Sequence, residues 1–218
     1  MEIDVIIPSY TNNVTKAMVK NCIISLRESE KSISFNVVII ESKNCIVDVG
    51  ADKTIYYCDT PFVYNRSLNI GIKETKNEWI ILANNDLIFH HHWMTAILQA
   101  HDKYPNIKSF TPWNNQWNWH PSIFGKPQTD IIEGYRICQE LGGWCIVCKR
   151  DIFDTITLSE RVKFWYSDNV YADALIEAGI KHALVTNSYV DHLISKTKVV
   201  SQLEAIQAYN EYCNINND

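Results

Sequence analysis

The sequence contains little glycine and proline, and it has no long hydrophobic run. Its 218 residues include only 7 glycines and 6 prolines, and no glycine-rich phosphate loop lies near the N-terminus. No apolar stretch is long enough to cross a bilayer, and no run of like charges or low-complexity segment interrupts the chain. The acidic first residues lead directly into an apolar segment, so we expect neither a signal peptide nor a membrane span.

Strong positive charge is also absent. The formal net charge is −5, whereas a protein that binds nucleic-acid backbones needs a basic patch, so we expect no contact with duplex nucleic acid. The 7 cysteines are an odd number scattered through apolar contexts. That pattern is typical of a reducing compartment and indicates a cytoplasmic protein.

Two of these cysteines, Cys145 and Cys148, form a single C-x-x-C pair. A structural zinc site would normally need a second pair of ligands at matching spacing, and the sequence has none. Residues three apart on a strand point to opposite faces of the sheet. We therefore interpret both cysteines as buried structural thiols.

Hydrophobic residues make up 46% of the chain, which is enough for the core of one large domain spanning residues 1–218. In the first part, short apolar runs typical of buried strands alternate with segments of helical periodicity. The order is β-α-β-β-α-β, which predicts an α/β fold with a mainly parallel central sheet flanked by helices. The predicted strands are 4–8, 35–40, 54–57 and 79–83, and the predicted helices are 14–28 and 64–76.

The remaining sequence predicts further elements around an irregular segment, residues 112–128, which is rich in tryptophan and proline. Ser167 or Asp168 is a typical N-cap for the helix that follows, and Gly179 is a typical C-terminal stop. The predicted helices are 92–104, 168–178 and 198–213, and the predicted strands are 107–111, 142–148, 182–185 and 189–192.

A polar triplet, Asn84, Asn85 and Asp86, follows the buried strand predicted over residues 79–83. A buried strand that ends in a carboxylate and two amides is typical of how an open α/β sheet presents groups to a ligand. These groups suit a hard divalent cation that carries phosphate oxygens. The same composition is also typical of a polar turn between two strands, and for this segment alone the turn is the better interpretation.

Several short segments, in order along nearly the whole chain, together resemble those of GT-A glycosyltransferases of the large family 2, which are inverting enzymes. The triplet resembles the metal motif of the rhamnosyltransferase-like branch, which does not indicate the sugar. The resemblance implies a GT-A fold with a nucleotide-binding half (1–111), an acceptor and catalytic half (112–192) and a C-terminal helix (193–218). The matching segments are 5–10, 37–42, 65–71, 79–82, 84–86, 142–144, 149–153, 168–179 and 189–192.

The resemblance implies a UDP-, dTDP- or GDP-linked sugar donor, whose departing diphosphate would be neutralised by Mn²⁺ or Mg²⁺. Asp86 matches the last acid of the family's Asp-x-Asp motif and is the expected metal ligand. His192 matches a histidine that is a further ligand in many members, although by itself it would be an ordinary loop histidine. Because Asn84 replaces the first acid of the motif, we expect it to bind ribose or phosphate, and we expect a lower metal affinity.

An inverting transfer requires one general base, which takes the proton from the attacking acceptor hydroxyl. Asp168 matches the family's base at the N-terminus of a helix, where an aspartate is also a common N-cap. Asp173 is the alternative base, but it lies within the same predicted helix, where a solvated face is the simpler interpretation.

The resemblance also implies that the nucleotide lies across the ends of the first, second and fourth strands. Tyr10 would contact the base, and Glu41 would bind the base or the ribose. Arg66 could pair with a phosphate, or it could equally be a surface arginine. The residues expected to bind the donor are Pro8, Ser9, Tyr10, Glu41, Asn65, Arg66, Asn84 and Asn85.

Three further patterns could contribute contacts to the acceptor or to the donor sugar. The three tryptophans of segment 113–120 either stack on acceptor sugars or form a lid or dimer contact. The histidines at 90–92 alternate sides, so we interpret them as loop and helix-start residues that could contact an acceptor. Gly142 and Gly143 would let the backbone approach the donor sugar.

Two other classes of protein compete with the transferase. A nucleotidyltransferase-like enzyme is disfavoured because the glycine-rich loop is absent. A catalytically weak nucleotide- or sugar-binding module is favoured by the single acid in the triplet, since fold similarity alone does not establish activity. The sequence leaves open the donor sugar, the oligomeric state and the acceptor, which could be a glycan or another hydroxyl compound.

Overall fold

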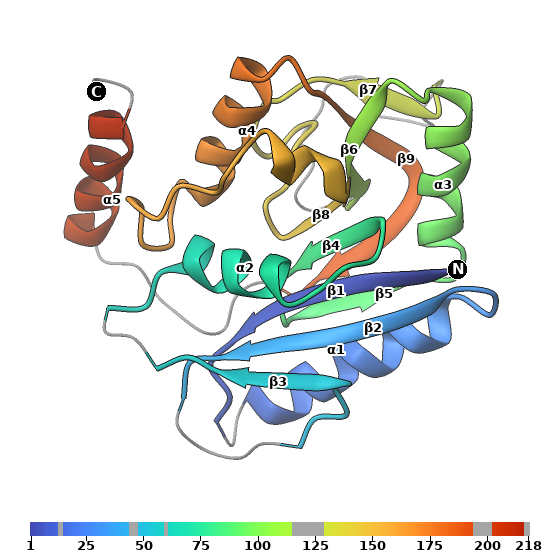
Figure 1. Ribbon diagram of the computed structural model, residues 1–218, viewed down its shortest axis with the longest axis horizontal. Helices are drawn as coiled ribbons and strands as arrows, with labels where there is room; N and C mark the ends of the chain where they lie inside the picture. The colour runs from blue at the N-terminus through green and yellow to red at the C-terminus, as the bar shows by residue number, and fades with distance from the viewer. Residues whose placement is uncertain (13–14, 44–47, 59–60, 115–128, 194–201, 216–218) are drawn as a thin grey trace.

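Helices cover both faces of a nine-stranded sheet, as the ribbon of the computed structural model shows (Figure 1). The structure describes residues 1–12, 15–43, 48–58, 61–114, 129–193 and 202–215. The strands are β1 (Glu2–Ser9), β2 (Ser34–Glu41), β3 (Lys53–Tyr56), β4 (Trp79–Ala83), β5 (Leu87–Phe89), β6 (Ile107–Trp113), β7 (Ile131–Glu133), β8 (Cys145–Lys149) and β9 (Lys181–His192). The helices are α1 (Thr15–Ser29), α2 (Tyr64–Lys73), α3 (Trp93–Lys103), α4 (Ser167–Glu177), α5 (Gln202–Ile215) and the short 3-10 helix η2 (Arg150–Asp154).

The sheet has the strand order β3-β2-β1-β4-β8-β6-β9-β5, and β7 pairs with β9 beside this path. The first four strands of the chain pair in parallel, as do β6 and β9. Strand β8 runs antiparallel between β4 and β6, and β5 and β7 run antiparallel to β9. The predicted α/β class, with a central sheet flanked by helices, is confirmed.

The alternation of side chains along the strands divides the core into two clusters. Val5 and Ile7 of β1 belong to the cluster with α1 and α3, whereas Ile6 belongs to the cluster with α2 and α4. Burying an aliphatic side chain of this size contributes about 1.5–3 kcal/mol. The apolar runs of the sequence are continuous rather than alternating because both faces of these strands are covered.

Helix α2 lies close against β1 because Gly71 has no side chain. A Cβ at this position would collide with the Cγ2 atom of Ile6. Close packing at this point positions α2 against the sheet. The first residue of the helix, Tyr64, is part of the candidate site described below.

Several predicted boundaries differ from the structure; the helix expected over 64–76, for example, ends at Lys73. The strands expected at 182–185 and 189–192 form one strand, β9, whose pairing with β6 shifts register between Pro112 and Trp113. The strand expected from residue 142 begins at Cys145, because the preceding residues form a turn in which Cys145 N–H donates to the Gly142 carbonyl. Within the segment expected to be irregular, β6 continues to Trp113, and residues 115–128 lie outside the described residues.

The two cysteines of the C-x-x-C pair lie on opposite faces of β8, as predicted. Cys145 packs in one core cluster and Cys148 in the other. Burial raises the pKa of the Cys148 thiol to about 12 and raises that of Cys145 well above its usual value. Both are therefore unreactive thiols rather than metal ligands.

A buried ion pair joins the start of β1 to the end of β8. The carboxylate of Asp4 is fully buried and lies 2.9 Å from the Arg150 guanidinium. It also accepts hydrogen bonds from the backbone N–H groups of Lys76 and Asn77. The pair therefore fixes the loop between α2 and β4 against both strands, and no local sequence pattern predicts it.

Candidate active site

The polar triplet forms the turn between β4 and β5, so the turn interpretation is correct for the backbone. The N–H of Asn84 donates to the carbonyl of Trp144 at 2.8 Å, which ties the turn to the residue before β8. The amide of Asn85 donates to the hydroxyl of Ser9, at the end of β1, at 3.3 Å. The triplet thus lies where the parallel strands end, and α/β sheets bind their ligands at that edge.

The pairing of β5 with β9 brings Asp86 and His192 together. Leu87 pairs with His192 in the antiparallel ladder, and the Leu193 N–H donates to the Asp86 carbonyl at 2.9 Å. As a result, Nε2 of His192 lies 3.2 Å from Oδ1 of Asp86, and the Asp86 side chain is 5% exposed. Among the described residues, this Oδ1 atom accepts no hydrogen bond.

This pair of atoms fits a divalent cation. A buried carboxylate oxygen costs free energy unless a proton, a donor or a cation compensates it. No third histidine, cysteine, aspartate or glutamate joins the pair in the part of the chain that the structure describes. Two protein ligands leave the other coordination positions to phosphate oxygens and water, as is usual for Mg²⁺ at phosphate sites.

The amide of Asn84 bridges His192 and a tyrosine that the sequence did not mark. The Tyr64 hydroxyl donates to Oδ1 of Asn84 at 2.9 Å, and Nδ2 of Asn84 lies 3.4 Å from Nε2 of His192. Burial raises the pKa of Tyr64, and the negative charges of Asp168 and Asp86 raise it further. Tyr64 therefore remains a protonated donor between the two carboxylates.

The indole ring of Trp144 fixes the plane of the His192 imidazole. The two rings stack with centroids 5.7 Å apart and an interplanar angle of 20°. Gly142 makes room for this tryptophan, because a Cβ at Gly142 would collide with its Nε1 atom. The Gly142 N–H donates to Thr111 at 3.3 Å, which anchors the segment to β6.

The second carboxylate of the site, Asp168, lies in the first turn of α4. Its Oδ1 accepts the Asn169 N–H at 3.0 Å. A Cβ at Gly143 would lie 2.6 Å from the Cβ of Asp168, so only glycine lets the segment before β8 pass this close. Burial raises the pKa of Asp168, although the N–H groups of Asn169, Asp168 and Gly143 oppose the shift. Asp168 also lines a small cavity with Tyr64 and Gly143.

The prediction that Ser167 or Asp168 caps this helix is wrong. Tyr166 is the N-cap, in a left-handed backbone conformation with φ 68°, and its side chain makes no capping hydrogen bond. The alternative base, Asp173, accepts a hydrogen bond from the Tyr212 hydroxyl of α5 at 2.7 Å. Gly179 has φ 66°, as expected for a residue just beyond the end of a helix.

Glu41 organises the loop that follows β1. Its carboxylate is buried and accepts the backbone N–H groups of Thr11 at 3.0 Å and of Lys43 at 2.9 Å. The Thr11 hydroxyl also bonds to Ser9 at 3.0 Å. Tyr10 remains 57% exposed, with the Lys43 ammonium 5.8 Å from its ring centroid. The loop therefore presents an open aromatic face beside Ser9.

The remaining residues expected to bind the donor lie around this loop and on α2. Pro8 is buried in β1 and pairs with Ile40 in β2. Asn65 lines the same small cavity as Asp168, and its amide donates to the Ser159 carbonyl at 2.8 Å. Arg66 forms an ion pair with Glu160 at 2.6 Å. Asn65 and Arg66 thus hold α2 against segment 158–160.

The three consecutive histidines lie in the loop before α3, as predicted. Nε2 of His90 pairs with Asp191 at 2.7 Å, and His92 is the helix N-cap with φ 66°. Of the three tryptophans between 113 and 120, Trp113 packs edge-on against Tyr189, and the other two lie outside the described residues.

The structure therefore brings together Asp86, His192, Asn84, Asn85 and Ser9. Sequence reasoning missed Tyr64 and the stacking role of Trp144, because both depend on contacts between distant segments. One local signal was present and unused, namely the three consecutive aromatic residues 164–166, which directly precede Ser167 and Asp168.

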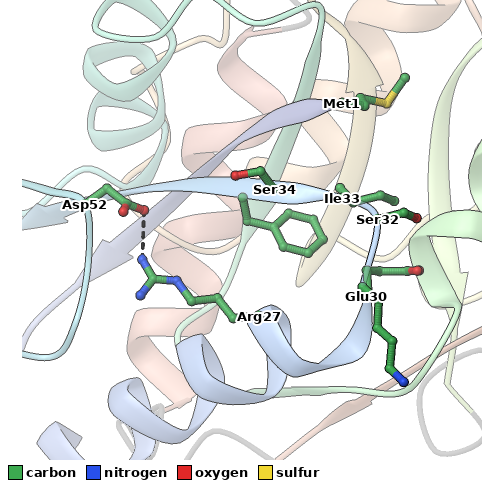
Figure 2. A pocket seen from close by; sticks show the side chains of 9 residues that line it. Met1, Arg27, Glu30, Ser32, Ile33, Ser34 and Asp52 are labelled. Atoms are coloured by element: carbon green, nitrogen blue, oxygen red, sulfur yellow. Dashed lines mark hydrogen bonds and ion pairs between the residues drawn. The ribbon is translucent and has the colours of Figure 1, made fainter.

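A separate surface hollow lies at the opposite ends of the same strands (Figure 2). It is lined by Met1 and Ser34, which adjoin the starts of β1 and β2, and by the ion pair of Arg27 and Asp52 at 2.8 Å. Parallel strands present their ligand-binding loops at their carboxyl ends. This hollow is consequently at the wrong edge to contribute to the candidate site.

Comparison with known proteins supports the fold. No family model and no curated protein matches the chain. The chain is similar to the crystal structure of residues 1–349 of S. aureus TarS, a family-2 glycosyltransferase, with a TM-score of 0.60 and 12% sequence identity. The match covers 87% of this chain and 59% of the TarS chain. At this identity the similarity shows the fold alone, and the expected GT-A fold is confirmed. No described helix is long and apolar enough to span a membrane.

The raised pKa of Asp168 predicts how its replacement changes stability. An aspartate whose pKa is raised by folding stabilises the native state below its unfolded pKa, and this contribution is lost as the pH rises through the folded pKa. Asp168→Asn should therefore melt at the same or a higher temperature than the wild type at pH 7.5, and the difference should shrink as the pH falls. Calorimetry across pH 4–8 checks this, with Asp102→Asn as a control for net charge. A lower melting temperature at pH 7.5 would contradict the prediction.

Proposed function

We propose that this protein is an inverting glycosyltransferase, which moves a sugar from a nucleoside-diphosphate donor to an acceptor hydroxyl with the help of Mn²⁺ or Mg²⁺. The observation that carries the proposal is the approach of Asp86 and His192 at the ligand-binding edge of a GT-A fold. Asp168 and Tyr64 line the same small cavity. The carboxylates of Asp86 and Asp168 both lie close enough to Tyr64 to raise its pKa.

The residues around the triplet would bind the diphosphate and the nucleoside. Oδ1 of Asp86 and Nε2 of His192 would hold the cation, and the stacked indole of Trp144 fixes the plane of the imidazole. The Asn84 amide, which lies 3.4 Å from Nε2, would give up this contact to the cation. A bound cation of this kind would neutralise the charge that develops on the departing diphosphate. Tyr10 would stack on the base from the loop that Glu41 organises, with the donor contacts of Asn65, Arg66 and Asn85 completing the pocket.

Asp168 would act as the general base. A direct displacement needs one group that takes the proton from the acceptor hydroxyl as it attacks the anomeric carbon. Its raised pKa makes this carboxylate a stronger base than an exposed aspartate. The six cysteines in the described residues are free thiols, which supports a cytoplasmic location.

The donor and the metal requirement can be tested together. We expect one family of nucleoside diphosphates, UDP, dTDP or GDP, to raise the melting temperature only when Mn²⁺ is present. A ligand at about 100 times its Kd stabilises the native state by about 2.7 kcal/mol. In Asp86→Ala the metal-dependent part of this shift should disappear, because one of the two protein ligands is lost. A full shift in Asp86→Ala, or no shift in the wild type, would contradict the proposal and favour the weak binding module.

Replacement of the base should separate binding from transfer. Asp168→Asn keeps the size of the side chain but cannot accept the acceptor proton, so transfer should fall about 10²–10⁴-fold. The nucleotide-induced thermal shift should be the same as in the wild type. Retained transfer in Asp168→Asn would show that another group is the base.

Removal of the Tyr64 hydroxyl should weaken metal binding without changing the ligands. Tyr64→Phe leaves Oδ1 of Asn84 without its donor, so the Asn84 amide is no longer held beside Asp86 and His192, where it would support the phosphate and water ligands of the cation. Loss of such a supporting contact typically weakens metal affinity about 10–100-fold. Mn²⁺ binding measured by electron paramagnetic resonance in the presence of nucleotide checks this. Tyr135→Phe is the matched control, since its hydroxyl donates to the Ile180 carbonyl at 3.0 Å, and equal affinities in both variants would contradict the role of Tyr64.

A further inference from the structure

A cluster of aromatic side chains lies beside the candidate site, and we name it the aromatic platform. It consists of Phe164, Trp165 and Tyr166, which precede α4, together with Tyr209 and Tyr212 of α5. Three of these side chains are largely accessible to solvent: Phe164 is 37% exposed, Trp165 43% and Tyr209 53%. Large aromatic side chains that gather on a surface are typical of binding sites.

The rings of the platform are held in place by one another. Tyr166 stacks on Tyr212 with centroids 5.2 Å apart and an interplanar angle of 9°, and Phe164 packs edge-on against Trp165 at 5.5 Å. The left-handed backbone of Tyr166 is a strained conformation that persists only where surrounding contacts enforce it, and such strain is concentrated at functional sites. The Ser167 hydroxyl closes the turn by donating to the Phe164 carbonyl at 2.8 Å.

The platform is continuous with the proposed base. The ring of Phe164 meets that of Tyr64 edge-on at 5.6 Å, and the Tyr64 N–H donates to the Lys163 carbonyl at 2.7 Å. Tyr64 in turn lines the small cavity that contains Asp168. A molecule lying on the exposed rings would therefore extend to the carboxylate that receives the acceptor proton.

The charges around the platform favour a neutral ligand. Lys163 pairs with Glu211 at 2.9 Å, and the Arg161 guanidinium donates to the Asn214 carbonyl at 3.2 Å. Both cations are thus engaged, whereas a phosphate-rich ligand would need them. The ion pair of Lys163 and Glu211 forms a polar rim beside the rings. Flat aromatic faces bordered by polar groups match the apolar faces and the hydroxyls of sugar rings.

We infer that the aromatic platform binds a carbohydrate acceptor, with Trp165 and Phe164 stacking on its sugar rings so that one hydroxyl reaches Asp168. This inference rests on the proposed function and names the class of its acceptor. It also places acceptor recognition on the segment before α4, in addition to the tryptophan-rich segment that the sequence suggested.

Two measurements with cellobiose, lactose, chitobiose and maltose as probes test the inference. The first is isothermal titration calorimetry with each saccharide, which needs neither a donor nor a tryptophan reporter. We expect at least one saccharide to give a heat of binding with the wild type, and we expect Trp165→Ala to raise the concentration for half-saturation about 10-fold, as loss of about 1.4 kcal/mol implies. Trp165→Phe keeps a ring and should restore most of the affinity.

The second measurement is saccharide-stimulated consumption of the sugar nucleotide identified by the thermal-shift screen. Trp165→Ala should raise the half-saturating saccharide concentration about 10-fold, whereas Ile176→Ala should leave both this concentration and the hydrolysis of donor without saccharide at their wild-type values. Ile176→Ala is the matched control, because Ile176 is an exposed apolar residue (54%) on α4, the helix that Trp165 precedes. Melting temperatures of all variants verify that they are folded.

The outcomes distinguish this inference from the proposed function. Saccharide binding that depends on Trp165 in a protein that consumes no sugar nucleotide would sustain the platform and overturn the transferase. Donor hydrolysis without any heat of saccharide binding or saccharide effect on the rate would sustain the transferase and overturn the platform. Equal saccharide affinities in Trp165→Ala and the wild type, or stimulation by glycerol phosphate or a serine peptide but by no saccharide, would also overturn it.

Discussion

The candidate site depends on the register between β5 and β9. These strands pair Leu87 with His192, and this pairing alone brings the Asp86 carboxylate to the imidazole of a residue 106 positions later. Side chains alternate along a strand, so a slip of one residue would turn His192 to the other face. The register is held by burial: Leu87 and Phe89 are core residues, and Val190 pairs with Phe89. The approach of Asp86 and His192 thus follows from the packing of three apolar side chains, Leu87, Phe89 and Val190, rather than from any attraction between the two residues.

Around this pair the protein uses glycine and burial in complementary ways. Two glycines let the segment before β8 pack closely against its neighbours. Gly142 leaves room for the indole of Trp144, and Gly143 lets the backbone lie against the side chain of Asp168. Burial then raises the pKa of Asp168 and keeps Tyr64 protonated. Each of these arrangements has a cost, since a buried ionised carboxylate and a missing side chain both lower stability. Such costs are typical of sites where geometry serves binding or catalysis.

The sequence was sufficient to predict the first half of the fold. Strands β1, β2 and β4 are continuous apolar runs, and α1 and α2 have a clear helical period, so local pattern and final structure agree. The sequence was less informative where contacts between distant residues determine the structure. Tyr166 adopts a left-handed N-cap conformation that no propensity predicts. Strand β9 is one strand because β6 and β7 pair with its first part and β5 pairs with its last three residues. Asp86, His192 and Asp168 were predicted through a family resemblance, whereas Tyr64 required the packing of α2 on β1.

The ion pair between Asp4 and Arg150 has a consequence for how the chain folds during its synthesis. The two residues are 146 positions apart, so the ribosome has made most of the chain before the guanidinium emerges. Until then Asp4 has only neutral donors such as the backbone of Lys76 and Asn77, and a buried charge without its counter-ion is strongly destabilising. The parallel strands β1 to β4 are synthesised first, but they reach their full stability only after β8 and the arginine that follows it. Nascent chains shorter than about 150 residues are therefore expected to expose the start of β1 to chaperones.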